Sequence, residues 1–376
     1  MTDNEYYVTE LPNFLNDTWP CQYAGVFPTG NDGANNVFFW MYPVFEDPEN
    51  DAPVAVFLNG GPGASSAFAN FLESGPQRIL ATETTSESGD TTFEYSIYNS
   101  KDTWTKTATM IYVDQPTGTG FSYGAPYVTS MEEASEQFVT FMVSLYEAFP
   151  ALQERELHMT GASYAGKYIP KFTVDLLKKN DQLPSTYFNI KSIQMGDPYT
   201  APYSQRLLSS KLPSSLNLYD LSNLPQVAAL DRSCAEDIGN LSTNAATCEM
   251  LMIYFSVTTG GVYTYDVRKF GYDWDYVEPA VTTYFIDNQA EIQPALHLQG
   301  DTMDPYFTFD RSEVADAFTE DGMLAYIADC QSLVDQGVPM LVYAGEFDDR
   351  CGPNQQVPWL KRLNFTDSES FWAQAR

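Results

Sequence analysis

A serine set between small residues is the first feature of the sequence that could do chemistry. Ser163 lies within the segment Gly161-Ala162-Ser163-Tyr164-Ala165-Gly166. An apolar run, Leu157–Thr160, precedes this segment and a helical pattern follows it, which is the setting of a nucleophile elbow. Strand and helix nearly touch at such a turn, so the positions two before and two after the serine must be small. The pattern predicts that Ser163 is a nucleophile at a helix N-terminus, where backbone N–H groups can receive an oxyanion.

A glycine-rich turn follows another apolar run, Val54–Leu58. The turn reads Asn59-Gly60-Gly61-Pro62-Gly63. Glycine leaves room for a backbone N–H to approach a reacting carbonyl oxygen with no side chain between them. Alone, such a segment indicates only a tight turn. Together with the serine segment, we interpret it as the second half of an oxyanion hole.

Several blocks of the sequence resemble the serine carboxypeptidases. They occur in the order that the family has, from near the N-terminus to about residue 365. The blocks are residues 58–66, 73–76, 113–123, 160–170, 295–297 and 342–345, with Asp348, Cys351 and Trp359 at the family's spacing. The resemblance implies an α/β-hydrolase fold, with a mostly parallel central sheet and an inserted cap region. It also implies removal of C-terminal residues from peptides, without a metal or cofactor.

The resemblance also implies roles for individual residues. Ser163 is then the nucleophile and Asp348 the acid of the catalytic triad. The backbone N–H groups of Gly61 and Tyr164 form the oxyanion hole. Asn59, Gly60 and Glu73 match positions that bind the terminal carboxylate of the substrate, and Cys351 matches a cysteine near the site that is not a nucleophile.

Some residues depart from the family's pattern. Ala162 stands where the family usually has a glutamate, the partner of Glu73 in holding the substrate's carboxylate. Ala64 replaces a cysteine, so we expect that family disulfide to be absent. Lys167 and Asp197 are milder departures.

The general base is the largest gap in the predicted site. A serine hydroxyl needs a neighbouring group to take its proton, and in this fold a histidine follows the acid along the chain. The sequence contains only His158 and His297, and both precede Asp348. We interpret His158 as a structural residue of the strand before Ser163, and His297 matches a family position without a catalytic role. We therefore expect the given chain to be an inactive fragment, with its histidine and its signal segment missing.

Apolar runs alternating with helical patterns predict the elements that position these residues. This alternation is typical of an α/β fold with a parallel sheet. We expect strands at 54–58, 109–113, 157–160, 190–195 and 340–344, and a helix at 131–149. Residues 201–282 are rich in Pro, Asn and Ser and are interpreted as a cap insertion. Residues 1–200 and 283–376 then form the core.

Composition limits the partners and the compartment. With 50 Asp plus Glu against 19 Lys plus Arg, the net charge is −31, which excludes nucleic acids and anionic membrane surfaces as natural partners. No apolar run is long enough to span a membrane. Among five cysteines we expect a Cys234–Cys248 disulfide. Sequons at Asn16, Asn240 and Asn364 fit a glycoprotein of the vacuole, the lysosome or the secreted space.

Three functions remain open at this stage. The first is a peptidase that acts on peptides with a free C-terminus through an acyl-enzyme. The second is an acyltransferase or esterase on the same scaffold, which the loss of a carboxylate-binding glutamate at Ala162 favours. The third is a binding homologue without catalysis, although such a protein would need neither Ser163 nor Asp348. Nothing in the sequence sets the oligomeric state.

Overall fold

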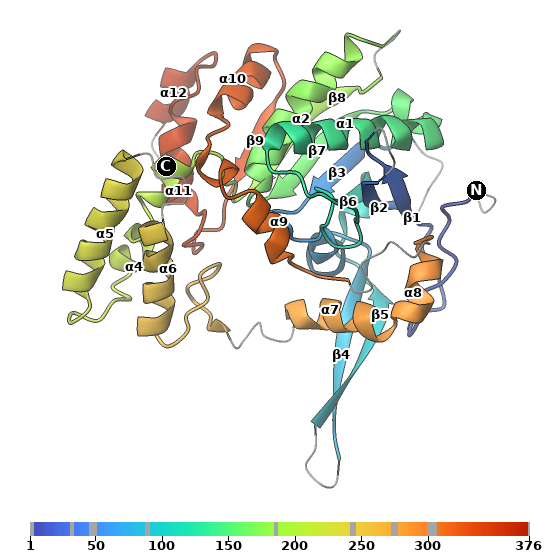
Figure 1. Ribbon diagram of the computed structural model, residues 1–376, viewed down its shortest axis with the longest axis horizontal. Coiled ribbons are helices and arrows are strands. Elements are labelled where there is room, and N and C mark those ends of the chain that lie inside the picture. Colours follow the sequence, from blue (N-terminus) through green and yellow to red (C-terminus); the bar gives the residue numbers. More distant parts are fainter. Residues whose placement is uncertain are drawn as a thin grey trace.

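A computed structural model describes residues 4–30, 34–44, 51–86, 91–183, 187–240, 246–271, 277–298 and 307–374. Parts of the expected cap, residues 241–245 and 272–276, therefore lie outside the described residues. Figure 1 shows a central sheet with helices on both faces, a long hairpin that stands away from it, and a group of helices to one side.

The central sheet has seven strands in the order β1-β2-β6-β3-β7-β8-β9. The strands β6, β3, β7, β8 and β9 run parallel, whereas β1 and β2 are antiparallel to their neighbours. Their bounds are β1 Tyr23–Pro28, β2 Asn36–Tyr42, β3 Val54–Leu58, β6 Thr109–Asp114, β7 Leu157–Ala162, β8 Ile190–Gly196 and β9 Met340–Tyr343. The five strands that we predicted are confirmed; β1 and β2 were not predicted.

Alternate residues of the strands pack into two separate hydrophobic clusters, one on each face of the sheet. Val54, Val56 and Leu58 of β3 belong to one cluster, whereas Ala55 and Phe57 belong to the other. Successive strand side chains point to opposite faces, so a strand buried on both faces must be apolar at every position. This requirement explains the unbroken apolar runs of the sequence.

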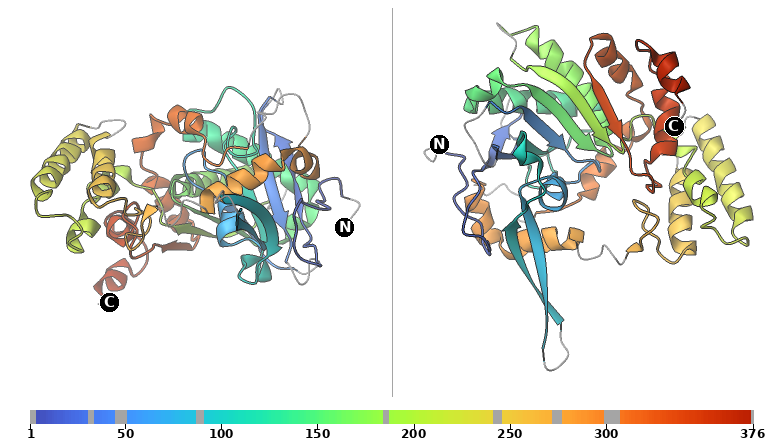
Figure 2. Two further views of the ribbon diagram at one scale, coloured as in Figure 1. Left: turned by 90° about the horizontal axis from the view of Figure 1, so that it is seen from below. Right: turned by 180° about the vertical axis from the view of Figure 1, so that it is seen from behind.

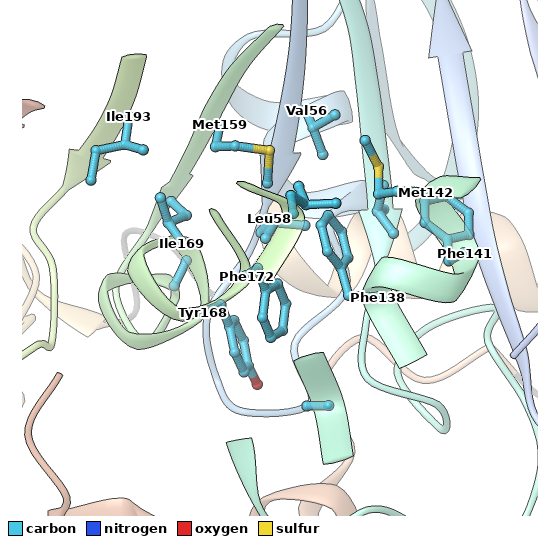
Figure 3. Packing of buried hydrophobic residues seen from close by; sticks show 14 of the residues in the cluster. Val56, Leu58, Phe138, Phe141, Met142, Met159, Tyr168, Ile169, Phe172 and Ile193 are labelled. Carbon is cyan, nitrogen blue, oxygen red and sulfur yellow. The ribbon is translucent and has the colours of Figure 1, made fainter. Parts of the chain in front are cut away.

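Two long helices, α1 (Met131–Ala148) and α2 (Ala165–Asn180), cover the first face. Figure 3 shows Phe138 and Phe141 of α1 and Phe172 of α2 packed against the strand residues of this cluster. Ser130 caps α1, because its side chain accepts the backbone N–H of Glu133 at 3.3 Å. The predicted helix at 131–149 is confirmed to within one residue.

The second face is covered by α7 (Val277–Asp287) and α8 (Gln289–Ala295). Residues of both helices, among them Tyr284 and Ile292, pack into the cluster that contains Phe57. Beside them, β4 (Gln77–Thr85) and β5 (Thr91–Asn99) form a separate two-stranded sheet, the hairpin that projects from the molecule (Figures 1 and 2). This hairpin was not predicted.

A third, smaller cluster lies mostly in the region that we interpreted as the cap, with Met323 added from outside it. Its helices are α3 (Pro202–Arg206), α4 (Lys211–Ser215), α5 (Leu224–Gly239) and α6 (Ala246–Thr258). A disulfide between Cys234 and Cys248 joins α5 to α6, as predicted. The other cysteines, Cys21, Cys330 and Cys351, are free. The cap boundary at residue 282 stays a prediction, because α7 spans it and packs on the sheet.

The remaining helices come from the C-terminal part of the chain. They are α9 (Ser312–Ala317), α10 (Ile327–Asp335), α11 (Pro353–Leu360) and α12 (Ser368–Ala373). The residues Cys330 and Leu333 of α10 and Trp359 of α11 complete the cluster beneath α2. None of the described helices combines the length and the apolar content that crossing a bilayer requires.

Candidate active site

Ser163 occupies a sharp turn between β7 and α2. Its φ angle is +60°, a region that non-glycine residues seldom adopt. The turn is held by its backbone: the N–H of Ser163 donates to the carbonyl of Gly196 at 3.0 Å, and the Ser163 carbonyl accepts the N–H of Tyr199 at 2.7 Å. The structure thus gives the strand, turn and helix that an exposed nucleophilic serine requires.

The small residues around Ser163 are needed for space. A Cβ atom added at Gly161 would lie 2.2 Å from the carbonyl oxygen of Leu58, and only 3.0 Å from the Cβ of Ala165. Strand β3, strand β7 and helix α2 therefore meet here at backbone distance. The predicted reason for small residues at these two positions is confirmed by these distances.

The glycine-rich turn lies directly against the serine. A Cβ atom added at Gly60 would lie 2.7 Å from the Tyr164 nitrogen and 3.0 Å from the Ser163 hydroxyl oxygen. Gly61, the next residue, has a φ of +109°. The structure therefore brings together the two segments whose N–H groups, those of Gly61 and Tyr164, were predicted to form an oxyanion hole. The role itself stays a prediction.

Asp348 lies in the loop after β9 and lines the same cleft as Ser163. Its carboxylate accepts the backbone N–H groups of Arg350 at 2.6 Å and Cys351 at 3.1 Å. Burial raises the pKa of Asp348 to about 7, and the nearby carboxylate of Asp197 adds to this rise, although the two N–H donors oppose it.

The cleft has a volume of about 1040 Å³ and draws on both the sheet and the cap. The sheet side contributes the loops after β3, β7, β8 and β9. The cap side contributes Arg206, Glu249 and Tyr265, which the sequence did not single out. Arg206 is paired with Glu249, and Arg350 donates to the Tyr265 hydroxyl at 2.9 Å. No group of His, Cys, Asp and Glu side chains in the described ranges is arranged to hold a metal ion.

Comparisons with known proteins decide the family. Residues 12–376 match the serine carboxypeptidase family. The chain belongs to this family. It is 30% identical to carboxypeptidase Y of Komagataella phaffii over 402 residues, which covers 98% of this chain and 71% of that protein. It is also 36% identical over 219 residues to the pheromone-processing carboxypeptidase KEX1 of Debaryomyces hansenii, covering 56% of this chain and 30% of that one.

A solved structure confirms the fold. The prohormone-processing carboxypeptidase Kex1 of Saccharomyces cerevisiae superposes with a TM-score of 0.79 at 22% identity, covering 96% of this chain and 82% of that one. The α/β-hydrolase fold that we predicted is therefore confirmed.

The residues that we predicted to bind the substrate's carboxylate line the cleft. Asn59, Glu73 and Ala162 all line it. Asn59 is held by its side-chain N–H, which donates to the Ser65 carbonyl at 3.0 Å. Loss of hydration raises the pKa of Glu73, and the carboxylate of Asp197 adds to the rise, whereas Arg78 opposes it. Ala162, where we expected the family's second carboxyl to be missing, offers only a methyl group to the cleft.

Neither histidine lies in the cleft. His158 is on β7, and its Nδ1 is 2.7 Å from the hydroxyl of Ser192 on β8. His297 bonds through Nδ1 to the carbonyl of Ala24, at 3.0 Å. The cleft is not lined by either residue, so the structure gives no contact between a histidine and Ser163.

The sequence also did not predict what surrounds Asp197 in the site. Asp197 follows β8, has a φ of +42°, and accepts the backbone N–H of Gly345 at 2.8 Å. The signal that could have found it is its position at the end of a predicted strand, because the carboxyl ends of neighbouring parallel strands lie at the same edge of a sheet. Cys351 lies beside this group, and burial raises the pKa of its thiol, which makes it a poor nucleophile.

Proposed function

We propose that the protein is a serine-type carboxypeptidase, which releases the last residue of a peptide through an acyl-enzyme. One observation supports this most: Ser163, the turn at Gly60–Gly61 and Asp348 line a single cleft. Ser163 attacks the last peptide carbonyl, and its proton passes through a base to the leaving amine. The peptide C–N bond breaks, and water then hydrolyses the ester.

The substrate's free carboxylate would meet Asn59, Gly60 and Glu73. Glu73 must be protonated to donate a hydrogen bond to a carboxylate, because two negative charges repel one another in a cleft of low dielectric. Its raised pKa favours this protonated form in mildly acidic surroundings. We therefore expect peptide acids to be preferred over peptide amides more strongly as the pH falls.

A second candidate, an esterase or acyltransferase, is favoured by one observation. Ala162 lines the cleft beside Ser163 and offers no hydrogen bond to a substrate carboxylate. An esterase or acyltransferase would treat acids and amides alike at every pH. The ratio of the two rates, measured between about pH 4 and about pH 7, where carboxylates titrate, distinguishes the candidates.

None of the described residues in the cleft is a histidine that could act as the general base for Ser163. Because His158 and His297 bond elsewhere, we expect residues 1–376 alone to show only the small turnover that an oxyanion hole supports without a triad. We infer a vacuolar, lysosomal or secreted location for the protein, which the Cys234–Cys248 disulfide supports because disulfides persist in oxidising compartments.

The test is chemical rescue of residues 1–376 with free imidazole. A small base from solution can enter the cleft and take the proton of Ser163, so hydrolysis of a blocked dipeptide should rise with imidazole concentration, by about tenfold or more, since general-base catalysis contributes 10²–10⁴-fold when the base is held in place. The matched control is Ser163→Ala, which should show no rise.

Two outcomes would contradict the proposal. Rescue that persists in Ser163→Ala would mean that Ser163 is not the nucleophile. Strong turnover without imidazole that Ser163→Ala abolishes would mean that one of the two histidines is the base, which His158→Asn and His297→Asn would identify.

A further inference from the structure

Two of the carboxyl groups that line the cleft, those of Asp197 and Asp348, lie close to each other. Asp197 follows β8 and Asp348 lies in the loop after β9, and these two strands are parallel neighbours. The pairing continues past the strand end, since the N–H of Asp197 donates to the Tyr343 carbonyl at 2.8 Å and Gly345 donates to the Asp197 carboxyl. The carboxyl groups lie within hydrogen-bonding reach of each other.

Backbone donors satisfy only one oxygen of each carboxyl. Oδ1 of Asp348 accepts from Arg350 and Cys351, and Oδ1 of Asp197 accepts from Gly345. Among the described residues, no donor bonds to the second oxygen, Oδ2, of either carboxyl, so Oδ2 is available for a bond between the two groups. An ionised carboxylate can only accept, so two facing carboxyls can bond only when one of them carries a proton.

No nearby positive charge in the described part of the chain neutralises the repulsion that two ionised carboxylates would feel at this distance. Among the described residues, no ion pair joins either carboxyl to a Lys or Arg side chain. The guanidinium of Arg350 is directed to the Tyr265 hydroxyl. The titratable groups that face the pair from the surrounding elements are Glu73, Tyr265, Tyr343, Asp349, Arg350 and Cys351. Glu73 and Asp349 add further negative charge when ionised, which favours a retained proton.

We propose that Asp197 and Asp348 share one proton, and that Asp197 is, through this proton, a positioning residue for Asp348. The pair then carries one negative charge, which is what a triad acid needs to stabilise a protonated base. This role rests on the proposed function, whereas the shared proton itself does not. The raised pKa of both groups agrees with it.

The shared proton links the site to pH. In the folded protein the pair holds a proton that an unfolded chain releases near pH 4, so the folded state binds more protons between about pH 4 and about 7. Stability from this pair is therefore full below about pH 4 and is lost as the pH rises through about 7. Above that range both carboxylates are ionised and repel one another.

Asp197→Asn tests the proposal with little change in shape. Asparagine tolerates the left-handed backbone at this position, and its amide can donate to Asp348 without a shared proton. The measurement is infrared spectroscopy of protein labelled with ¹³C at aspartate carboxyls, titrated from about pH 3 to about pH 9, a range that spans both the ordinary and the raised values. We expect the wild type to show a protonated carboxyl that titrates near neutral pH and that Asp348→Asn removes. The second condition separates it from Asp114 and Asp349, because burial raises their pKa values to about 6 and about 8.

In Asp197→Asn that signal should be lost, and Asp348 should titrate at a lower pH than in the wild type, although burial still keeps its pKa raised. Asp348→Asn should remove the same signal, and it also serves if Asp197→Asn fails to fold. The matched control is Asp310→Asn, because Asp310 lines the same cleft with a pKa raised by burial, but does not face the pair. It should leave the signal in place.

A thermal melt gives a second readout that needs no catalysis. Asp197→Asn should stabilise the protein relative to wild type more at pH 8 than at pH 5, because only the wild type develops repulsion as the pH rises. An unchanged titration in Asp197→Asn would overturn the proposal, as would an Asp348→Asn variant that loses no signal titrating near neutral pH. Failure of imidazole rescue would leave these results intact, so the two proposals fail separately.

Discussion

The sheet and the cap bury their apolar side chains in different ways. Each face of the sheet has a continuous cluster in which aromatic rings pack together. On one face, Phe27 of β1 packs against Phe141 of α1, with ring centroids 6.0 Å apart. The cap has one smaller cluster, in which Phe255 packs against Tyr219. Its helix α6 also leaves apolar side chains such as Ile253 exposed. A small core contributes less to the free energy of unfolding than a large one. The cap compensates with a covalent link, the Cys234–Cys248 disulfide.

Because of this difference, we expect the sheet and the cap to contribute to the cleft in different ways. The loops at the ends of the strands hold Ser163 and Asp348 with backbone hydrogen bonds. These two residues are therefore fixed by the rigid sheet. The cap contributes side chains through a smaller unit, although backbone bonds connect the two: Asp349 donates to Thr264 at 2.9 Å, and Val267 donates to Phe347 at 3.0 Å. We expect the sheet to determine the chemistry and the cap to adjust access.

The largest test compares the same substitution in both regions. Phe138→Ala removes a fully buried ring from the sheet cluster, and Phe255→Ala removes one from the cap cluster. Each should cost about 3–5 kcal/mol of the unit in which it lies. Phe138→Ala should lower the main thermal transition, whereas Phe255→Ala should lower hydrogen-exchange protection in α5 and α6 and leave α1 and α2 protected. Equal loss of protection everywhere would show that the two regions unfold as one.

An intermediate effect is expected from the disulfide. Replacing both Cys234 and Cys248 with serine opens a link between residues 14 apart in sequence, which costs about 3 kcal/mol in the chain-entropy account. Loss of protection should be confined to the cap, and a reducing agent should reproduce it in the wild type. Cys21→Ser, at a free cysteine, is the control and should change neither region. A fall in the stability of the sheet would contradict the separation.

The smallest effect is expected at the start of α1. Ser130→Ala removes the hydroxyl that accepts the Glu133 N–H, and an N-cap of this kind contributes about 1 kcal/mol. Because α1 covers the sheet, the main transition in a urea melt should move to a lower urea concentration. The stability of the cap should not change. Ser214→Ala is the control, since Ser214 is exposed on α4 and its hydroxyl bonds to none of the described residues. A similar shift in both variants would exclude capping as the cause.

The sequence predicted best the parts of the fold that local pattern determines. Strands β3 and β6 are buried on both faces, so they read as unbroken apolar runs. The hairpin β4–β5 was missed because Gln77–Thr85 contains many polar residues and pairs with one strand only, so burial imposes little pattern on it. Strand β2 was missed although it is apolar, because no helical pattern follows it to mark a parallel unit.

The candidate site divides in the same manner. Ser163 and the turn at Gly60–Gly61 were predictable because a tight turn constrains neighbouring residues in the sequence. The pairing of Asp197 with Asp348, and of Arg206 with Glu249, depends on how distant segments meet. No local pattern records such contacts, since either partner alone is an ordinary polar residue in a loop.

The left-handed backbone of Ser163 places reactivity and stability in opposition at one residue. A side chain in this conformation costs about 1–3 kcal/mol, which glycine would avoid. Glycine, however, has no hydroxyl. Selection for thermal stability alone would therefore favour glycine over serine at this turn. Stabilising substitutions should be made at other positions and should leave Ser163 unchanged.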